Sequence, residues 1–240
     1  MIAGIALFAA ALAAGAPARA EAANPVVIEL FVSQACGACY KATNVARRVA
    51  DSADALLLTY AVDYWDYRGW KDTFARPEHK ARQEAYRGNL ENRRLYTPQA
   101  VVQGAYDVRG DSRDGLNLAL DAAPPSRVRI ISSEMVDGGV RIALAEANLS
   151  REVDIWIAPF MSGDVAVNVR AGENKGRSMQ FRNVVRGMAY GGKWDGRGEN
   201  RMIPVAVEDA ANACAIIVQE ANAGRILAVS VAAPNGQFAP

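Results

Sequence analysis

The sequence has only three cysteines and one histidine among 240 residues, so it offers few of the soft ligands that metal sites use. The cysteines are Cys36, Cys39 and Cys214, and the histidine is His79. A four-ligand zinc site would need all of them. We therefore predict no metal, and no cofactor other than a redox-active pair formed by Cys36 and Cys39.

The sequence also lacks an excess of charge of either sign. Its 27 basic and 26 acidic residues leave a formal net charge of +1, which gives no support to nucleic-acid binding. No internal repeat and no low-complexity tract is present, so a repeat architecture is not indicated. At this length, with 51% apolar residues, the chain can form one or two cores.

Long apolar runs are absent as well, except at the start of the chain. The apolar stretch 2–14 is shorter than the roughly 20 residues of a membrane-spanning helix. It leads to Ala18-Arg19-Ala20, the small-x-small pattern that signal peptidase cleaves. We predict a signal peptide over residues 1–20, a periplasmic or secreted protein, and no membrane span after cleavage. An uncleaved N-terminal anchor is the alternative.

Hydrophobic periodicity predicts an α/β arrangement in the first half. Residues 26–33 and 55–62 are apolar runs typical of strands buried on both faces, and 39–53 has apolar residues at helical spacing. Such a β-α-β unit should have a right-handed crossover. The chain then predicts a loop over 63–74, a helix over 78–90, strands over 99–102 and 106–108 around a Gln103-Gly104 turn, and a helix over 113–122 capped by Asp111 or Ser112.

Pro124-Pro125 ends this pattern and marks the boundary between predicted domains 24–123 and 126–240. Frequent turn residues in the second half predict a mostly β, sandwich-like domain. Among these turns are 137–139, 162–164 and 191–192. The predicted strands are 127–135, 140–147, 153–160, 165–170, 178–187, 202–208, 214–220 and 226–232.

Cys36 and Cys39 form a C-x-x-C motif that follows a strand and opens a helix. With the element order β-α-β-α-β-β-α, this resembles the thioredoxin fold and implies a thioredoxin-like first domain. Amide groups and the dipole at a helix start favour a thiolate at Cys36, and the Gly37-Ala38 spacer lets Cys39 resolve a mixed disulfide. The spacer holds no His or Pro, so we predict a moderate thiol rather than an extreme oxidant.

The same resemblance implies three further features of the site. Thr97-Pro98 takes the place of the cis-proline that faces the cysteines, where a substrate backbone can pair with it. The Cys36 sulfur is expected to be exposed at the helix tip. Glu29, in the first strand, is the candidate for a buried acid that assists Cys39; a carboxylate bonded to neighbouring backbone is the alternative.

Other interpretations of the cysteine pair and of nearby residues stay open. The pair could brace a turn, although closing so short a loop contributes only about 2 kcal/mol. Trp65 and Trp70 either rim the active site or pack a long loop onto the domain. His79 is predicted at the surface and Cys214 as a buried free thiol, with a third redox partner as the alternative. The polar stretch 170–186 suits an anion, a partner or a solvated hairpin.

Several longer strings resemble a family of secreted bacterial proteins labelled domain of unknown function 1223. They are VIELFVSQACGAC, VDYWDYRGWKDTFA, RQEAY, YTPQAVVQG and GENKGRSMQFRNVVRGM. The resemblance implies a thioredoxin-like domain with a β-rich C-terminal part, and it brings no established activity. It points to Cys36, Cys39 and Pro98, with motif residues of unassigned role at Trp65, Trp70, Arg82, Gln83 and Tyr86.

These observations predict an exported thiol–disulfide oxidoreductase that acts on protein disulfides. Cys36 attacks, Cys39 resolves, and Thr97-Pro98 presents the substrate backbone. Its partners would be protein thiols or disulfides together with a redox partner. The alternative is a non-catalytic binding module of the cell envelope, built on a thioredoxin-like scaffold.

Overall fold

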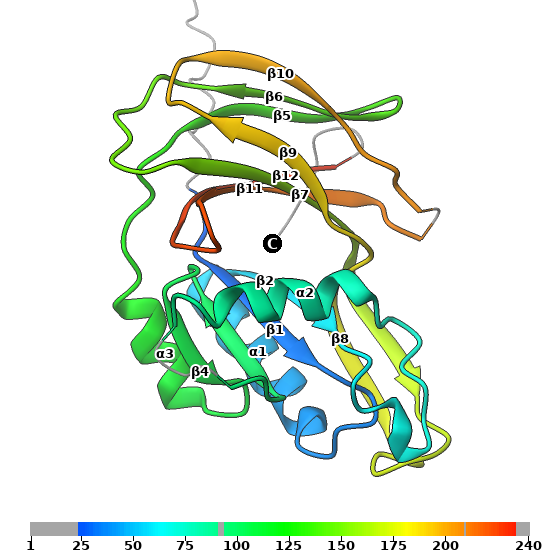
Figure 1. Ribbon diagram of the computed structural model, residues 1–240. Helices are drawn as coiled ribbons and strands as arrows, with labels where there is room; N and C mark the ends of the chain where they lie inside the picture. Colours follow the sequence, from blue (N-terminus) through cyan, green and yellow to red (C-terminus); the bar gives the residue numbers. More distant parts are fainter. Residues whose placement is uncertain (1–23, 91–93, 209, 234–240) are drawn as a thin grey trace, which may run out of the picture.

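The computed structural model describes residues 24–90, 94–208 and 210–233 (Figure 1). Within them the chain is mixed α/β, with a large mixed sheet that includes a β-α-β unit and a small antiparallel sheet. The predicted signal peptide lies outside the described residues. The helices are α1 (Cys39–Ala53), η1 (Asp66–Arg68, 3-10), α2 (Pro77–Tyr86) and α3 (Arg113–Asp121). The strands are β1 (Val27–Val32), β2 (Leu56–Ala61), β3 (Gln99–Val102), β4 (Tyr106–Arg109), β5 (Ile130–Val136), β6 (Gly139–Leu144), β7 (Val153–Asn168), β8 (Ser178–Val185), β9 (Ala189–Trp194), β10 (Glu199–Pro204), β11 (Ala213–Glu220) and β12 (Ile226–Ala232).

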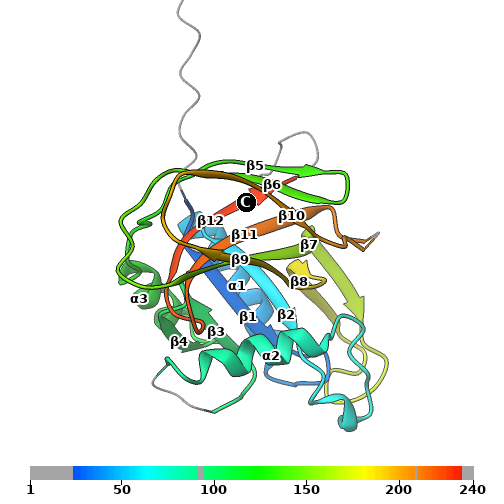
Figure 2. The ribbon, with the colours of Figure 1, turned by 45° about the horizontal axis from the view of Figure 1, so that its top comes forward.

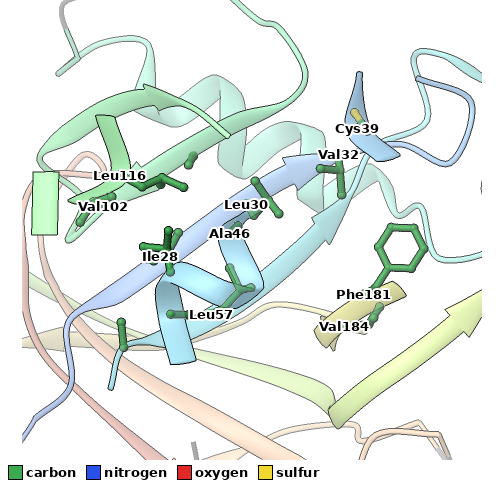
Figure 3. Close-up of a cluster of buried hydrophobic side chains, with 14 of the residues drawn as sticks. Ile28, Leu30, Val32, Cys39, Ala46, Leu57, Val102, Leu116, Phe181 and Val184 are labelled. Carbon is green, nitrogen blue, oxygen red and sulfur yellow. The ribbon is translucent and has the colours of Figure 1, made fainter. Parts of the chain in front are cut away.

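The first β-α-β unit forms as the sequence predicts. β1 pairs in parallel with β2 and antiparallel with β3, so it lies inside the sheet and is buried along its whole length. Its residues alternate between two faces. Ile28 and Leu30 pack with Ala46 of α1 (Figure 3), whereas Phe31 packs with Tyr86 of α2 on the other face. The helices α1 and α2 therefore cover opposite faces of β1.

The large sheet joins the two halves of the chain. Its order is β12-β11-β7-β8-β2-β1-β3-β4, and β9 also pairs with β7. The junction is the parallel contact of β2 with β8, where Thr59 lies opposite Val184. Strands from both predicted domains, 24–123 and 126–240, therefore share one sheet. The division into two domains stays a prediction.

β7 is one long strand where the sequence predicted two. The predicted turn at 162–164 is an irregularity in the pairing of β7 with β8, and Gly163 takes a φ of 88° there. The predicted turn at 191–192 likewise lies inside β9, a strand that the pattern did not predict, and Gly192 has a φ of 92°. Glycine supports a bulge as readily as a turn, so the sequence signal was ambiguous at both places.

Two helix ends differ from or refine the prediction. The helix predicted over 78–90 begins at Pro77 and ends at Tyr86. Proline fits the first helical position because the amide hydrogen that it lacks would have no partner within the helix. Ser112 caps α3 by accepting a hydrogen bond from the Gly115 N–H at 3.2 Å, which decides between the two predicted caps.

The small sheet, β10-β6-β5, packs on one face of β7, β11 and β12 (Figure 2). Ile142 of β6 and Ile216 of β11 belong to this shared core. The opposite face of β11 packs against the first half of the chain, where Ile217 lies in one cluster with Leu58. β11 is therefore buried on both faces along its whole length. Among the described helices, none is long and apolar enough to cross a membrane.

Gly104, in the turn between β3 and β4, is predicted to be required for the contact of this turn with the β11–β12 turn. Its φ is +64°, and an added Cβ would lie 2.5 Å from the Gly224 carbonyl oxygen. We expect Gly104→Ala to lower the free energy of unfolding by about 2 kcal/mol, from left-handed strain and the backbone collision. Urea denaturation measures this loss. Gly138→Ala is the control, because Gly138 also has positive φ but open space around it; an equal loss in both variants would contradict the collision.

Candidate functional site

Cys36 and Cys39 form a disulfide at the start of α1. Their Cα atoms are 5.4 Å apart, and Cys39 is the first residue of the helix. A tight backbone turn shapes the loop, because Cys36 N–H donates to Ser33 O at 3.1 Å and Cys39 N–H to Cys36 O at 3.0 Å. The cap residue Ala38 supplies no side-chain acceptor. The first amides of α1 thus lie around the cysteine pair, as the C-x-x-C motif predicts.

The disulfide is buried, so the prediction of an exposed Cys36 is wrong for this closed, oxidised form. Cys36 is 3% exposed and Cys39 is fully buried. Both pack in the cluster that also contains Val32 of β1, and Figure 3 shows Cys39 beside that residue. Ala38, between them, is exposed. The approach to the pair from solvent is therefore past the Gly37-Ala38 spacer.

The Thr97-Pro98 peptide is cis, as predicted. Pro98 is buried and Thr97 half-buried, directly before β3. A methyl group added to Gly110 would lie 3.2 Å from Pro98 Cβ and 3.6 Å from Ala42 Cβ. Gly110 thus lies close to both Pro98 of the cis peptide and Ala42 of α1, three residues after Cys39.

Glu29 lies on the face of β1 away from α1, so the structure does not bring it to the cysteines. Arg82 of α2 donates from Nε to Glu29 Oε1 at 2.5 Å and from Nη2 to Oε2 at 3.0 Å. The Tyr86 hydroxyl donates a short hydrogen bond to the same carboxylate. Gln219 of β11 completes this buried network by bonding to Arg82 and Tyr86.

The structure assigns structural roles to three motif residues whose role the sequence left open. Arg82 and Tyr86 hold Glu29, and Gln83 holds the strand after the cis peptide. The Gln83 side-chain amide donates to Gln99 Oε1 at 2.7 Å and to the Tyr96 carbonyl at 2.9 Å. All three come from one face of α2, at helical spacing.

The loop between β2 and α2 packs against the cysteine cluster. Trp65 and Trp70 both contact the buried cluster that holds Cys36 and Cys39. The Trp70 indole N–H donates to Gln34 Oε1 at 2.8 Å, two residues before Cys36. Trp65 carries the Arg68 guanidinium over its ring, 4.6 Å from the centroid. Both tryptophans therefore fix the surroundings of the pair.

Asp72 is a buried carboxyl beside the cysteine loop that the sequence analysis missed. It is 4% exposed and accepts hydrogen bonds from Gln34 N–H at 2.6 Å and Phe74 N–H at 2.8 Å. Burial raises its pKa to about 6, although these hydrogen bonds lower it. Its place inside a predicted loop gave no signal, because loop carboxylates are normally solvated.

The turn between β7 and β8 is the second feature that sequence reasoning did not connect to the site. The name 172–177 turn denotes its residues 172–177, which directly precede β8. Asn174 in it is fully buried and donates to the Cys36 carbonyl at 2.8 Å and the Gln34 carbonyl at 2.9 Å. Glu173 accepts from Gly37 N–H at 3.0 Å and pairs with Arg68. The polar composition of 170–186 was the only signal.

His79 and Cys214 lie away from the cysteine pair. His79 is fully buried, so the prediction of a surface position is wrong. Its Nδ1 lies 2.8 Å from the Ala61 carbonyl oxygen, and burial lowers its pKa to about 4. Cys214 of β11 is a buried free thiol in the core between the two sheets, and burial raises its pKa to about 11. Within the described residues, no group of three His, Cys, Asp or Glu side chains could hold a metal.

Comparison with known proteins places the chain in a family. Residues 27–219 match the family described as "Protein of unknown function (DUF1223)". The crystal structure of protein AGR_C_4864 from Agrobacterium tumefaciens is similar, with 29% identity, a TM-score of 0.74, and 91% of this chain and 98% of that chain covered. HBP35 of Porphyromonas gingivalis shares the fold at 9% identity and a TM-score of 0.59, over 91% of this chain and 79% of that one. No curated protein matches the sequence. The family match covers most of the chain, which therefore belongs to DUF1223.

Proposed function

We propose that this protein is an exported thiol–disulfide oxidoreductase on a thioredoxin-like arrangement, followed by a sandwich-like β-rich part. The observation that carries the proposal is the Cys36–Cys39 disulfide at the first turn of α1, and the cis Thr97-Pro98 peptide supports it. Its proposed place is the periplasm or the cell exterior, where protein thiols and disulfides are the substrates.

The proposed reaction is two successive thiol–disulfide exchanges. In the reduced protein, the Cys36 thiolate attacks one sulfur of a substrate disulfide, and the other substrate sulfur leaves as a thiolate. The Cys39 thiolate then attacks Cys36, which forms the Cys36–Cys39 disulfide and releases the second substrate sulfur. Two electrons pass from the protein to the substrate. A thiol reductant returns the pair to the reduced state, and the same steps run in reverse oxidise a substrate dithiol.

One observation favours the alternative of a non-catalytic binding module. Cys36 is 3% exposed in the oxidised form, so the disulfide shown here is closed to a protein substrate. Catalysis therefore requires the residues that pack over Cys36 to move away from it. A scaffold with a bracing disulfide would never need to open, so the two readings predict different chemistry for the single-cysteine variants.

We expect Cys39→Ala to trap substrates as mixed disulfides and Cys36→Ala to trap none. Without Cys39, the intermediate on Cys36 has no internal thiol to resolve it. The measurement is non-reducing electrophoresis of each variant after incubation with a scrambled-disulfide test protein. Cys214→Ala is the control, because its buried thiol should leave trapping unchanged. Absence of mixed disulfides with Cys39→Ala, or equal amounts with Cys36→Ala, would refute the oxidoreductase proposal.

A further inference from the structure

One side of the 172–177 turn contacts the segment 34–37 that carries Cys36, and the other side is exposed. Its residues Glu173 and Asn174 bond to Gly37 and Cys36, which lie more than 130 positions earlier in the chain. Figures 1 and 2 both show the turn beside the loop that carries η1. Arg68 of η1 forms the ion pair with Glu173. Two separate segments thus meet at the approach to the disulfide.

The two residues of the turn hold it with unequal strength. Asn174 is fully buried and donates to two backbone carbonyls, so its removal would take this donor from the Gln34 carbonyl and leave the Cys36 carbonyl with the Cys39 N–H. The Glu173 side chain is 43% exposed, and an ion pair at such a position contributes little to stability. Asn174 therefore anchors the turn, and Glu173 is the contact that opens more readily.

Glu173 affects Cys36 in two physical ways. A methyl group added to Gly37 would lie 2.5 Å from Glu173 Oε2, so the carboxylate lies directly against the residue after Cys36 and limits approach to it. The carboxylate also occupies the N–H of Gly37, the residue between Cys36 and the helix cap Ala38, so this amide is not free to donate to a Cys36 thiolate. A negative charge next to a thiol disfavours the thiolate further.

We propose that Glu173 is a positioning residue that restrains the cysteine pair: from the turn that Asn174 anchors, its carboxylate lies against Gly37 beside the disulfide and occupies the Gly37 amide. This inference rests on the proposed function, because restraint of the pair matters only if it exchanges disulfides. A substrate must displace Glu173 from Gly37 before it reaches Cys36. The released Arg68 and Gly37 N–H then become available to the incoming partner.

The first test measures access to the disulfide in the oxidised, full-length protein. Dithiothreitol attacks the pair, leaves two protein thiols and is itself oxidised to its cyclic disulfide. We expect reduction to be about fivefold to tenfold faster in Glu173→Ala than in the wild type, and about twofold faster in Glu173→Gln, which keeps the cover but not the charge. Lys175→Gln, a charge change on the same exposed turn, should stay within about twofold of the wild type.

The second test measures the thiolate itself. We expect the pH profile of iodoacetamide alkylation of reduced Cys36 to move to lower pH in Glu173→Gln and to stay in place in Lys175→Gln. Urea midpoints of all variants show whether a faster reaction merely reflects a weaker fold. Wild-type rates and an unmoved profile in both Glu173 variants would overturn the inference. Neither reagent is a protein substrate, so these results hold whether or not Cys39→Ala traps a partner.

Discussion

Replacing Arg82 with methionine is expected to lower the free energy of unfolding by about 3–5 kcal/mol, because it leaves a buried carboxylate without its cation. Glu29 is fully buried, and the Arg82 side chain is 6% exposed. Burial lowers the pKa of Arg82, but the charge of Glu29, the neighbouring Tyr86 and Tyr60 and the hydrogen bond to Glu29 together raise it above its usual value, so Arg82 stays charged. Tyr86 and Gln219 cannot replace the lost charge, because they supply only neutral hydrogen bonds.

Urea denaturation of Arg82→Met, Glu29→Met and the double variant tests this account. Each single variant strands one charge, whereas the double variant removes both and should regain most of the loss. Lys80→Met is the matched control on the same helix. Its pair with Glu84, at 3.6 Å, is exposed on both sides and should contribute about 0.5 kcal/mol or less. A loss below about 1 kcal/mol in Arg82→Met would show that water reaches Glu29.

This network explains why the sequence misassigned Glu29. A strand periodicity of two specifies which residues share a face, but it does not say which face receives the cysteine helix. The helix α1 was predicted with its observed bounds because its apolar spacing is local. The partners of Glu29 come from α2 and β11, and only the tertiary arrangement brings them together. The motif RQEAY includes both partners of Glu29, Arg82 and Tyr86, but no local pattern in the sequence indicates what these residues contact.

The cover over the cysteines was beyond sequence reasoning for the same physical reason. C-x-x-C, the cis Thr97-Pro98 peptide and the order of the first elements all follow from short-range patterns, and these features were predicted. The contact of Glu173 with Gly37 instead depends on the path of β7, which the sequence predicted as two strands. Two strands with a turn between them would send the following turn elsewhere. Bulges at glycine therefore decide where the 172–177 turn lies.

Asp72 and His79 are expected to give opposite pH dependences of stability that nearly cancel in the wild type. Asp72 has its pKa raised from 3.8 to about 6, so the folded state binds the extra proton between these values and stability falls as pH rises. His79 has its pKa lowered from 6.5 to about 4, so the unfolded state binds the extra proton and stability rises with pH. Each shift corresponds to about 3 kcal/mol.

Removing one of the two groups should therefore expose the slope of the other. From about pH 4 to about pH 6.5, Asp72→Asn should become more stable relative to the wild type by up to about 3 kcal/mol, and His79→Gln less stable by a similar amount. Both variants keep a hydrogen-bonding group, so other losses should be constant offsets. Urea unfolding across this range measures the differences. Profiles parallel to the wild type would mean that neither group is buried in the form that unfolds. Opposite slopes would show that both groups titrate from buried positions in the fold and that the two contributions offset each other in the wild type.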